Sequence, residues 1–91
     1  MMKEVKMFMT ETCPHCKKAF SMMEEICREH PEYKAVRIET IDETMEADYA
    51  ATFDYHYVPT FYVDGVKMHE GSPTKEALAK VYAEAVKTDV N

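Results

Sequence analysis

The most constraining feature of the sequence is a change of hydrophobic period near the N-terminus. Residues 5–9, VKMFM, form a short and mostly apolar run whose length suits a β-strand better than a helix. After the proline at position 14 no further glycine or proline interrupts the chain before His30-Pro31, a dipeptide that ends a helix. The apolar side chains in this interval recur at steps of three and four, as on one face of an amphipathic helix: Cys16, Ala19, Phe20, Met23, Ile26 and Cys27. A strand at residues 5–9 followed by a helix from Pro14 to about Glu29 is therefore expected.

The middle of the chain predicts a second strand and a second helix. Residues 35–39, AVRIE, alternate in polarity, which is typical of a half-buried strand with Val36 and Ile38 on one face. Thr40 and Glu43 have the Thr-x-x-Glu spacing of a capping box, in which both side chains satisfy free amides at a helix start. A short helix ending near Thr52 is expected to follow this box.

The last third of the chain predicts a hairpin and a final helix. Two β-prone runs, residues 60–63 and 66–70, flank Asp64-Gly65, a dipeptide that tolerates the positive φ angles of a tight turn. Ser72 followed by Pro73 is typical of an N-cap with proline at the first helical position. The buried face of the final helix is expected to carry Leu78, Val81, Tyr82 and Ala85.

These elements predict an α/β fold of order β-α-β-α-β-β-α. Two strands joined through a helix are parallel with a right-handed crossover, and a terminal hairpin adds two antiparallel strands. The result is a mixed four-stranded sheet flanked by three helices. Because 91 residues suffice for one hydrophobic core only, we expect a single domain over residues 1–91.

Charge and hydropathy limit the kinds of binding partner that we expect. The 17 acidic residues outnumber the 11 lysines and arginines, and the net charge of −6 has no basic stripe, so nucleic acid is not an expected partner. The start of the chain lacks the apolar segment of a signal peptide, and no run approaches the roughly 18 apolar residues of a membrane span. We expect a cytoplasmic monomer without membrane contact.

The three cysteines carry the functional prediction. An odd count does not suit a disulfide scaffold, and in a reducing cytosol a close pair is more often catalytic or metal-binding. Cys13 and Cys16 flank the expected start of the first helix, where free backbone N–H groups and the helix dipole stabilise a thiolate. We therefore expect Cys13 to be the nucleophile and Cys16, one turn further in, to be the resolving thiol. Cys27 shares the helix face of Cys16 and is expected to fill the core.

The two residues between the cysteines are expected to affect the reduction potential of the pair. Pro14 suits the first helical position and restricts the loop. A protonated His15 would place a positive charge beside the thiolate and favour the reduced form. Stabilising the reduced form raises the reduction potential, so a stronger oxidant is expected than a neutral linker would give.

The Cys-Pro-His-Cys motif after a strand, together with Val58-Pro59-Thr60 at the start of the hairpin, resembles the thioredoxin superfamily. In size the chain is similar to glutaredoxins and small glutaredoxin-like thioredoxins, and the resemblance spans nearly the whole chain. It implies a thiol–disulfide oxidoreductase that carries no bound cofactor besides a redox-active Cys13–Cys16 disulfide. It also implies a cis peptide bond before Pro59 and a substrate-binding surface formed by Thr12, Tyr57, Val58, Pro59 and Thr60. His56 and Tyr57 are equally compatible with a specificity role and with a role limited to the loop.

The sequence departs from typical glutaredoxins at their glutathione site. That site resembles Ser-Lys-x-x-Cys before the helix and Gly-Gly-x-Asp after the last strand, whereas this chain has Thr10 in place of the lysine and Glu70-Gly71-Ser72-Pro73 in place of the second element. Glu11 adds a negative charge near the cysteines. We therefore expect protein disulfides as substrates and a flavin-dependent, thioredoxin-reductase-like reductant, with a glutathione-dependent glutaredoxin as the alternative.

Two other functions compete with redox activity. Cys13, Cys16, Cys27 and His30 form a Cys3His pattern typical of zinc sites. Cys16 and Cys27, however, lie eleven residues apart on one expected helix, or roughly 16 Å, too far for two ligands of one ion. We therefore expect no metal. A redox-inactive interaction module that retains the fold is the remaining alternative.

Overall fold

The computed structural model describes residues 3–87. The expected order of helices and strands is confirmed, with one short 3₁₀ helix, η1, added between the first helix and the second strand. The elements are β1 (Val5–Met9), α1 (Pro14–Glu29), η1 (Pro31–Ala35), β2 (Ile38–Asp42), α2 (Ala47–Ala50), β3 (Thr60–Val63), β4 (Val66–Glu70) and α3 (Lys75–Ala85).

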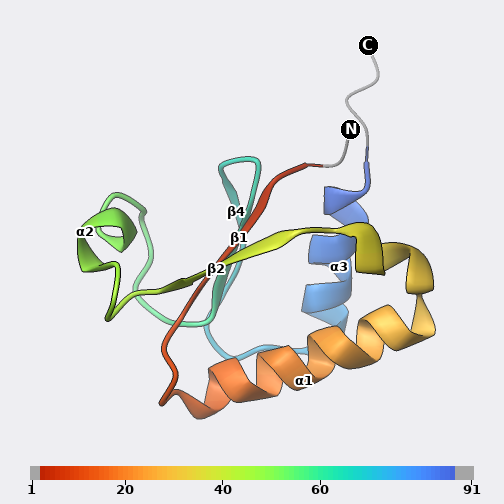
Figure 1. The fold of residues 1–91 in the computed structure, drawn as a ribbon, viewed down its shortest axis with the longest axis horizontal. Coiled ribbons are helices and arrows are strands. Elements are labelled where there is room, and N and C mark those ends of the chain that lie inside the picture. The colour runs from red at the N-terminus through yellow and green to blue at the C-terminus, as the bar shows by residue number, and fades with distance from the viewer. Residues whose placement is uncertain (1–2, 88–91) are drawn as a thin grey trace.

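The four strands form one mixed sheet of order β2-β1-β3-β4. β1 pairs in parallel with β2 and antiparallel with β3, and β3 pairs antiparallel with β4. The hairpin turns at Asp64 and Gly65, with φ angles of 48° and 82°, as the dipeptide predicted. Figure 1 shows α1 and α3 together on one side of the sheet and α2 on the other.

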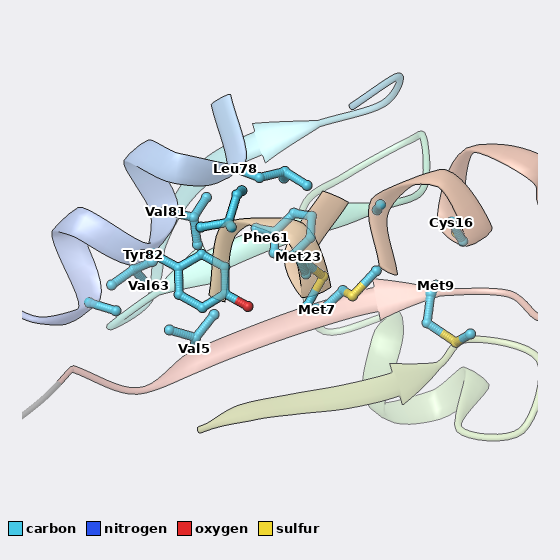
Figure 2. Packing of buried hydrophobic residues seen from close by; sticks show 13 residues of the cluster. Val5, Met7, Met9, Cys16, Met23, Phe61, Val63, Leu78, Val81 and Tyr82 are labelled. Atoms are coloured by element: carbon cyan, nitrogen blue, oxygen red, sulfur yellow. The ribbon is translucent and has the colours of Figure 1, made fainter. Parts of the chain in front are cut away.

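The alternation of side chains along β1 divides the core between the two sides of the sheet. Met7 points toward α1 and α3, in a cluster that we call the helix face (Figure 2). Phe8 points the opposite way, into a cluster with Ile41, Ala50 and Tyr62 that we call the loop face. The helix face comprises Val5, Met7, Met9, Cys16, Ala19, Met23, Ile26, Phe61, Val63, Leu78, Val81, Tyr82 and Ala85.

The second strand and second helix differ from the prediction. Ala35 ends η1, so the strand covers Ile38–Asp42 and not residues 35–39. The expected capping box is wrong because Thr40 lies within β2, where it pairs with Met7. The Asp42 carboxylate accepts hydrogen bonds from the backbone N–H (2.9 Å) and the hydroxyl (2.6 Å) of Thr44, which begins a turn. A single helical turn, α2, follows this turn.

Two details of the outer helices also differ. The N-cap of α3 is Thr74 and not Ser72: the Thr74 hydroxyl accepts from the Ala77 N–H at 3.1 Å. Phe20, expected in the core, is 37% exposed, and Cys27 is half-buried. The four residues predicted for the buried face of α3 are all buried.

Candidate active site at the start of helix α1

Cys13 is the N-cap of α1 and is half-buried. Its backbone is extended, and its carbonyl accepts hydrogen bonds from the N–H groups of Cys16 (3.1 Å) and Lys17 (3.2 Å). Pro14 occupies the first helical position as predicted, and Pro14 and His15 are both exposed. No side chain caps this helix start. Pro14 has no N–H and the Cys16 N–H is engaged by the Cys13 carbonyl, so the His15 N–H and the helix dipole are what the first turn offers to stabilise a thiolate.

Cys16 lies one turn further along and is 1% exposed. Figure 2 shows it at the end of the helix face that also holds Met9. The pKa of the Cys16 thiol is raised to about 11, chiefly by burial and also by a hydrogen bond with Cys13 and the negative charge of Glu43, whereas a hydrogen bond with the Thr10 backbone opposes the shift. Both thiols are free. The pair thus consists of one accessible sulfur and one sulfur that stays protonated.

The peptide bond between Val58 and Pro59 is cis, as the resemblance implied. The Cys13 thiol donates to the Val58 carbonyl, with the sulfur 3.8 Å from the oxygen. Val58 is half-buried and Pro59 is buried. Within residues 3–87, the Val58 N–H donates to no other group. The backbone of Val58 therefore lies against the exposed thiol with its amide unoccupied.

The other residues predicted for substrate binding fall into two groups. Thr12 and Tyr57 are exposed, Tyr57 by 70%, and both precede a residue in contact at the site. Thr60 is fully buried, and its hydroxyl donates to the Tyr57 carbonyl. We call residues 53–59 the cis-proline loop. Thr60 holds this loop in place through its hydroxyl and is not part of the surface that a substrate could contact.

Side chains of the sheet hold the cis-proline loop in place, and no sequence pattern predicted them. The Tyr62 hydroxyl donates to the Asp54 carbonyl at 2.6 Å, and the Glu70 carboxylate accepts from the amides of His56 and Tyr57. Neither periodicity nor motif connects residues eight to fourteen positions apart. Only the departure from Gly-Gly-x-Asp at Glu70 marked one of these positions as unusual.

The residues of the Cys3His pattern are not brought together. Cys27 lies near the end of α1, beside Tyr82 of α3; burial raises the pKa of Tyr82, and a hydrogen bond with Cys27 adds to the shift. His30 is exposed beyond the helix end. Across the described range 3–87, no three His, Cys, Asp or Glu side chains are grouped so that they could hold one metal ion.

A family model described as a thioredoxin domain matches residues 3–83. The chain belongs to this thioredoxin family. A thioredoxin from Methanocaldococcus jannaschii is 34% identical over 77 residues, which cover 85% of this chain and 88% of the relative. A probable thioredoxin from Methanothermobacter thermautotrophicus is 27% identical over 86% of this chain and 89% of its own length.

A solved structure has the same fold as this thioredoxin-family chain. A mutant thioredoxin from Halobacterium salinarum superposes with a TM-score of 0.67 over 94% of this chain and 76% of its own, at 18% identity. The relatives and the family model identify the chain as a thiol–disulfide oxidoreductase. None of the helices within residues 3–87 has the length and apolar character needed to cross a membrane.

Proposed function

We propose that this thioredoxin-family chain reduces or exchanges disulfides of other proteins through the dithiol of Cys13 and Cys16. One observation carries the proposal: the half-exposed Cys13 thiol, at an uncapped helix start, contacts the Val58 carbonyl next to the cis bond, while Cys16 is buried one turn behind. This places an attacking sulfur, a resolving sulfur and a backbone docking point within one site.

The reaction proceeds by two exchanges. The Cys13 thiolate attacks one sulfur of the substrate disulfide; a Cys13–substrate disulfide forms, and the other substrate sulfur leaves as a thiolate that takes up a proton. Cys16 then loses its proton and attacks the Cys13 sulfur, which releases the second substrate thiol. The substrate gains two electrons, and the protein loses two electrons as the Cys13–Cys16 disulfide forms.

The high pKa of Cys16 orders these steps. A thiol that ionises near pH 11 is almost wholly protonated at neutral pH, so Cys16 does not compete with Cys13 for the substrate. Once Cys13 is part of a mixed disulfide, its thiol no longer raises the pKa of Cys16. Burial also keeps Cys16 within reach of Cys13 only. The resolving step is thereby confined to the intermediate.

A peptide substrate docks on Val58 in this proposal. The free N–H of Val58 and its carbonyl are groups with which an extended peptide segment pairs, and the carbonyl lies 3.8 Å from the Cys13 sulfur. Thr12 and Tyr57 are exposed beside the site and are the proposed side-chain contacts. The backbone pairing accepts many sequences, and the flanking side chains select among them.

The proposed reductant is a flavin-dependent reductase of the thioredoxin-reductase type. Thr10, Glu11 and Glu70 occupy positions where a glutathione site would need positive or flexible groups, and Glu70 is already engaged by the loop amides. A reductase-coupled dithiol works in a reducing compartment, so the proposal places the protein in the cytoplasm. Comparing its reduction by such a flavoprotein and by glutathione tests this choice; faster reduction by glutathione would contradict it.

Two cysteine variants test the reaction itself. Cys13→Ser is expected to lower reduction of a disulfide-bonded protein such as insulin to the background rate. Cys16→Ser is expected to accumulate a covalent mixed disulfide with that substrate, visible by mass spectrometry. Cys27→Ser serves as the matched control and should retain activity. Equal residual turnover in the Cys13→Ser and Cys16→Ser variants would contradict the assigned roles.

A further inference from the structure

We propose that Glu70 is a positioning residue for protein-disulfide exchange: from β4, its carboxylate fixes the backbone of His56 and Tyr57 and so orients Val58 for the substrate. The inference rests on the proposed function, because it assigns Val58 to substrate binding. Glu70 does not contact either cysteine of the pair. Its influence on the reaction passes through the cis-proline loop.

The two contacts of Glu70 with the loop backbone converge on one carboxylate oxygen. Oε2 accepts from the His56 amide at 2.5 Å and from the Tyr57 amide at 3.0 Å. Oε1 accepts from Lys67 Nζ at 2.8 Å. Two successive N–H groups directed at a single atom fix the orientation of two successive peptide planes, and the second plane is followed directly by Val58. The Val58 N–H lies in the next peptide plane, together with the Tyr57 carbonyl that accepts from the Thr60 hydroxyl. Glu70 and Thr60 therefore hold the planes on the two sides of Tyr57, and both are needed to fix the direction of the Val58 amide.

A β-bulge in β4 brings the two charged side chains together. Tyr62 pairs with Lys67 and Phe61 pairs with His69, so two residues of β3 face three of β4 and Met68 is the extra residue. Side chains three positions apart normally point to opposite faces of a strand. The bulge returns Lys67 and Glu70 to the same face, which is the one under the cis-proline loop.

The charge on Glu70 persists over the working pH range. The hydrogen bond from Lys67 and the two amide hydrogen bonds lower the pKa of the Glu70 carboxyl to about 2. The carboxylate is therefore ionised wherever Cys13 can act as a nucleophile. Glu70 acts as a permanent fastening of the loop and not as a pH switch.

The Glu70 contacts lie at the surface, so their loss should affect the orientation of the loop more than the stability of the fold. His56 and Tyr57 are exposed, so water can replace the carboxylate when Glu70 is removed, and no buried donor is left unsatisfied. The aromatic packing of the loop and the hydrogen bonds of Tyr62 and Thr60 remain. The fold should survive the loss of Glu70, while the backbone before Val58 loses one of the two restraints that orient it.

The test compares three variants on two substrates. Glu70→Ala removes the acceptor, and Glu70→Gln keeps one oxygen that can accept both amide hydrogen bonds. Glu39→Ala is the matched control, because Glu39 is an exposed carboxylate on β2, the edge strand opposite β4, and pairs with Lys6 of β1. The substrates are a disulfide-bonded protein, insulin, and a small aromatic disulfide that makes no backbone pairing. Alkylation of Cys13 by iodoacetamide reports the thiol itself.

Glu70→Ala is expected to lower kcat/KM for insulin about tenfold, mainly through KM, since two hydrogen bonds of ordinary strength are lost. Its rates with the small disulfide and with iodoacetamide should equal those of the wild type. Glu70→Gln should recover most of the insulin activity, and Glu39→Ala should match the wild type throughout.

Three outcomes would overturn the inference, and they are distinguishable. Unchanged insulin kinetics in Glu70→Ala would show that the fastening does not matter to the substrate. An equal loss with both disulfides would show general damage to the site. Inactivity of the wild type toward insulin but not toward the small disulfide would overturn the proposed function and the role of Glu70 with it.

Discussion

The two faces of the sheet hold their partners in different ways. On the helix face, α1 and α3 pack mainly through aliphatic, methionine and cysteine side chains, with Tyr82 as the buried aromatic residue of α3, and the regular backbone hydrogen bonds within each helix give them their shape. On the loop face, the cis-proline loop has little regular structure. It is held by four aromatic rings, by hydrogen bonds that Tyr62 and Lys67 donate, and by hydrogen bonds that the Glu70 carboxylate accepts.

Each face delivers one half of the active site. The helix face supplies Cys13 and Cys16 at the start of α1, and the cis-proline loop, which is held on the loop face, supplies Val58, whose side chain packs against both clusters. A helix places its side chains through its own repeating backbone, whereas an irregular loop depends on distant side chains for its position. Changes on the helix face should therefore alter the chemistry of the thiols, and changes on the loop face should alter substrate docking.

The largest expected effect on the helix face concerns the titration of Cys16. Its pKa is raised from 9.0 to about 11, chiefly by burial and also by Cys13 and Glu43. In Cys13→Ser/Cys27→Ala, which leaves a single thiol, the thiolate absorbance in the ultraviolet should rise with a midpoint well above 9.0, because burial, the largest cause, remains. A midpoint at or below 9.0 would show that the resolving thiol is not protected by the helix face.

The raised pKa of Cys16 also predicts how the free energy of unfolding changes with pH. A thiol with a raised pKa in the folded state contributes stability that is fully present below the pKa of the unfolded chain, near 9.0, and that is lost as the pH rises through about 11. Cys16→Ala should lack this contribution. Urea unfolding of the reduced protein between pH 8 and 11 measures the difference between the two chains.

The next effect compares neighbouring residues on the two faces. Phe8 lies within 4.7 to 5.9 Å of three rings, those of Phe53, Tyr55 and Tyr62. Phe8→Leu should lower the free energy of unfolding by about 2–3 kcal/mol, since each aromatic pair contributes roughly 0.5–1.5 kcal/mol beyond buried area. Met7→Leu, on the helix face, nearly conserves volume and should cost less than about 1.5 kcal/mol.

Activity should separate these two variants further. Phe8→Leu loosens the packing under the cis-proline loop and should raise KM for a protein disulfide, whereas Met7→Leu should not. Equal changes in KM for both variants would show that the two faces do not divide docking from chemistry. Chemical denaturation and insulin reduction measure the two quantities on the same preparations.

The difference between the faces also explains what the sequence could predict. The stripe of apolar residues from Cys16 to Ile26, the parallel crossover and the Asp64-Gly65 turn are local or periodic signals, and all three are confirmed. The cysteine pair and the cis bond could be predicted because they belong to recognisable motifs, Cys-Pro-His-Cys and Val58-Pro59-Thr60. Helix-face geometry was therefore accessible from the sequence, with Phe20 as the exception because it lies at the edge of the stripe.

The errors fall where two local signals compete. Thr40 and Glu43 satisfy a capping box, but pairing of Thr40 with Met7 draws the residue into β2, and the Asp42 side chain starts the turn instead. The hydrogen bonds of Glu70 to the loop depend on a bulge and on a separation of thirteen and fourteen residues. Neither the register nor the bulge is encoded in a local pattern, so these contacts could not be predicted.

A smaller effect is expected where the loop face meets the end of β2. The Tyr55 hydroxyl donates to Glu43 at 2.6 Å, and burial followed by this bond raises the pKa of Tyr55. Tyr55→Phe keeps the ring and removes the bond, and it should lower the free energy of unfolding by about 1.5 kcal/mol, as for a hydrogen bond to a charged partner. Tyr62→Phe, which loses a bond to the neutral Asp54 carbonyl, should cost about 1 kcal/mol. The reverse order in urea unfolding would contradict this assignment.

The smallest effect concerns the two helix starts on the helix face. Thr74 caps α3 through its hydroxyl, whereas α1 begins at Cys13 without a side-chain cap. Thr74→Ala should cost about 1 kcal/mol of unfolding free energy, and Ser72→Ala, at the position first expected to cap, should stay within about 0.5 kcal/mol. Equal costs would show that both hydroxyls share the cap.

The contrast between these helix starts has a functional reason. A capping side chain at Cys13 would occupy the amides that a thiolate there requires, so α1 gives up roughly the stability that Thr74 supplies to α3. A helix that only packs has no such constraint and closes its N-terminus. If Thr74→Ala destabilises the protein while leaving insulin reduction unchanged, the cap of α3 is purely structural, and the open start of α1 is the one tied to the chemistry.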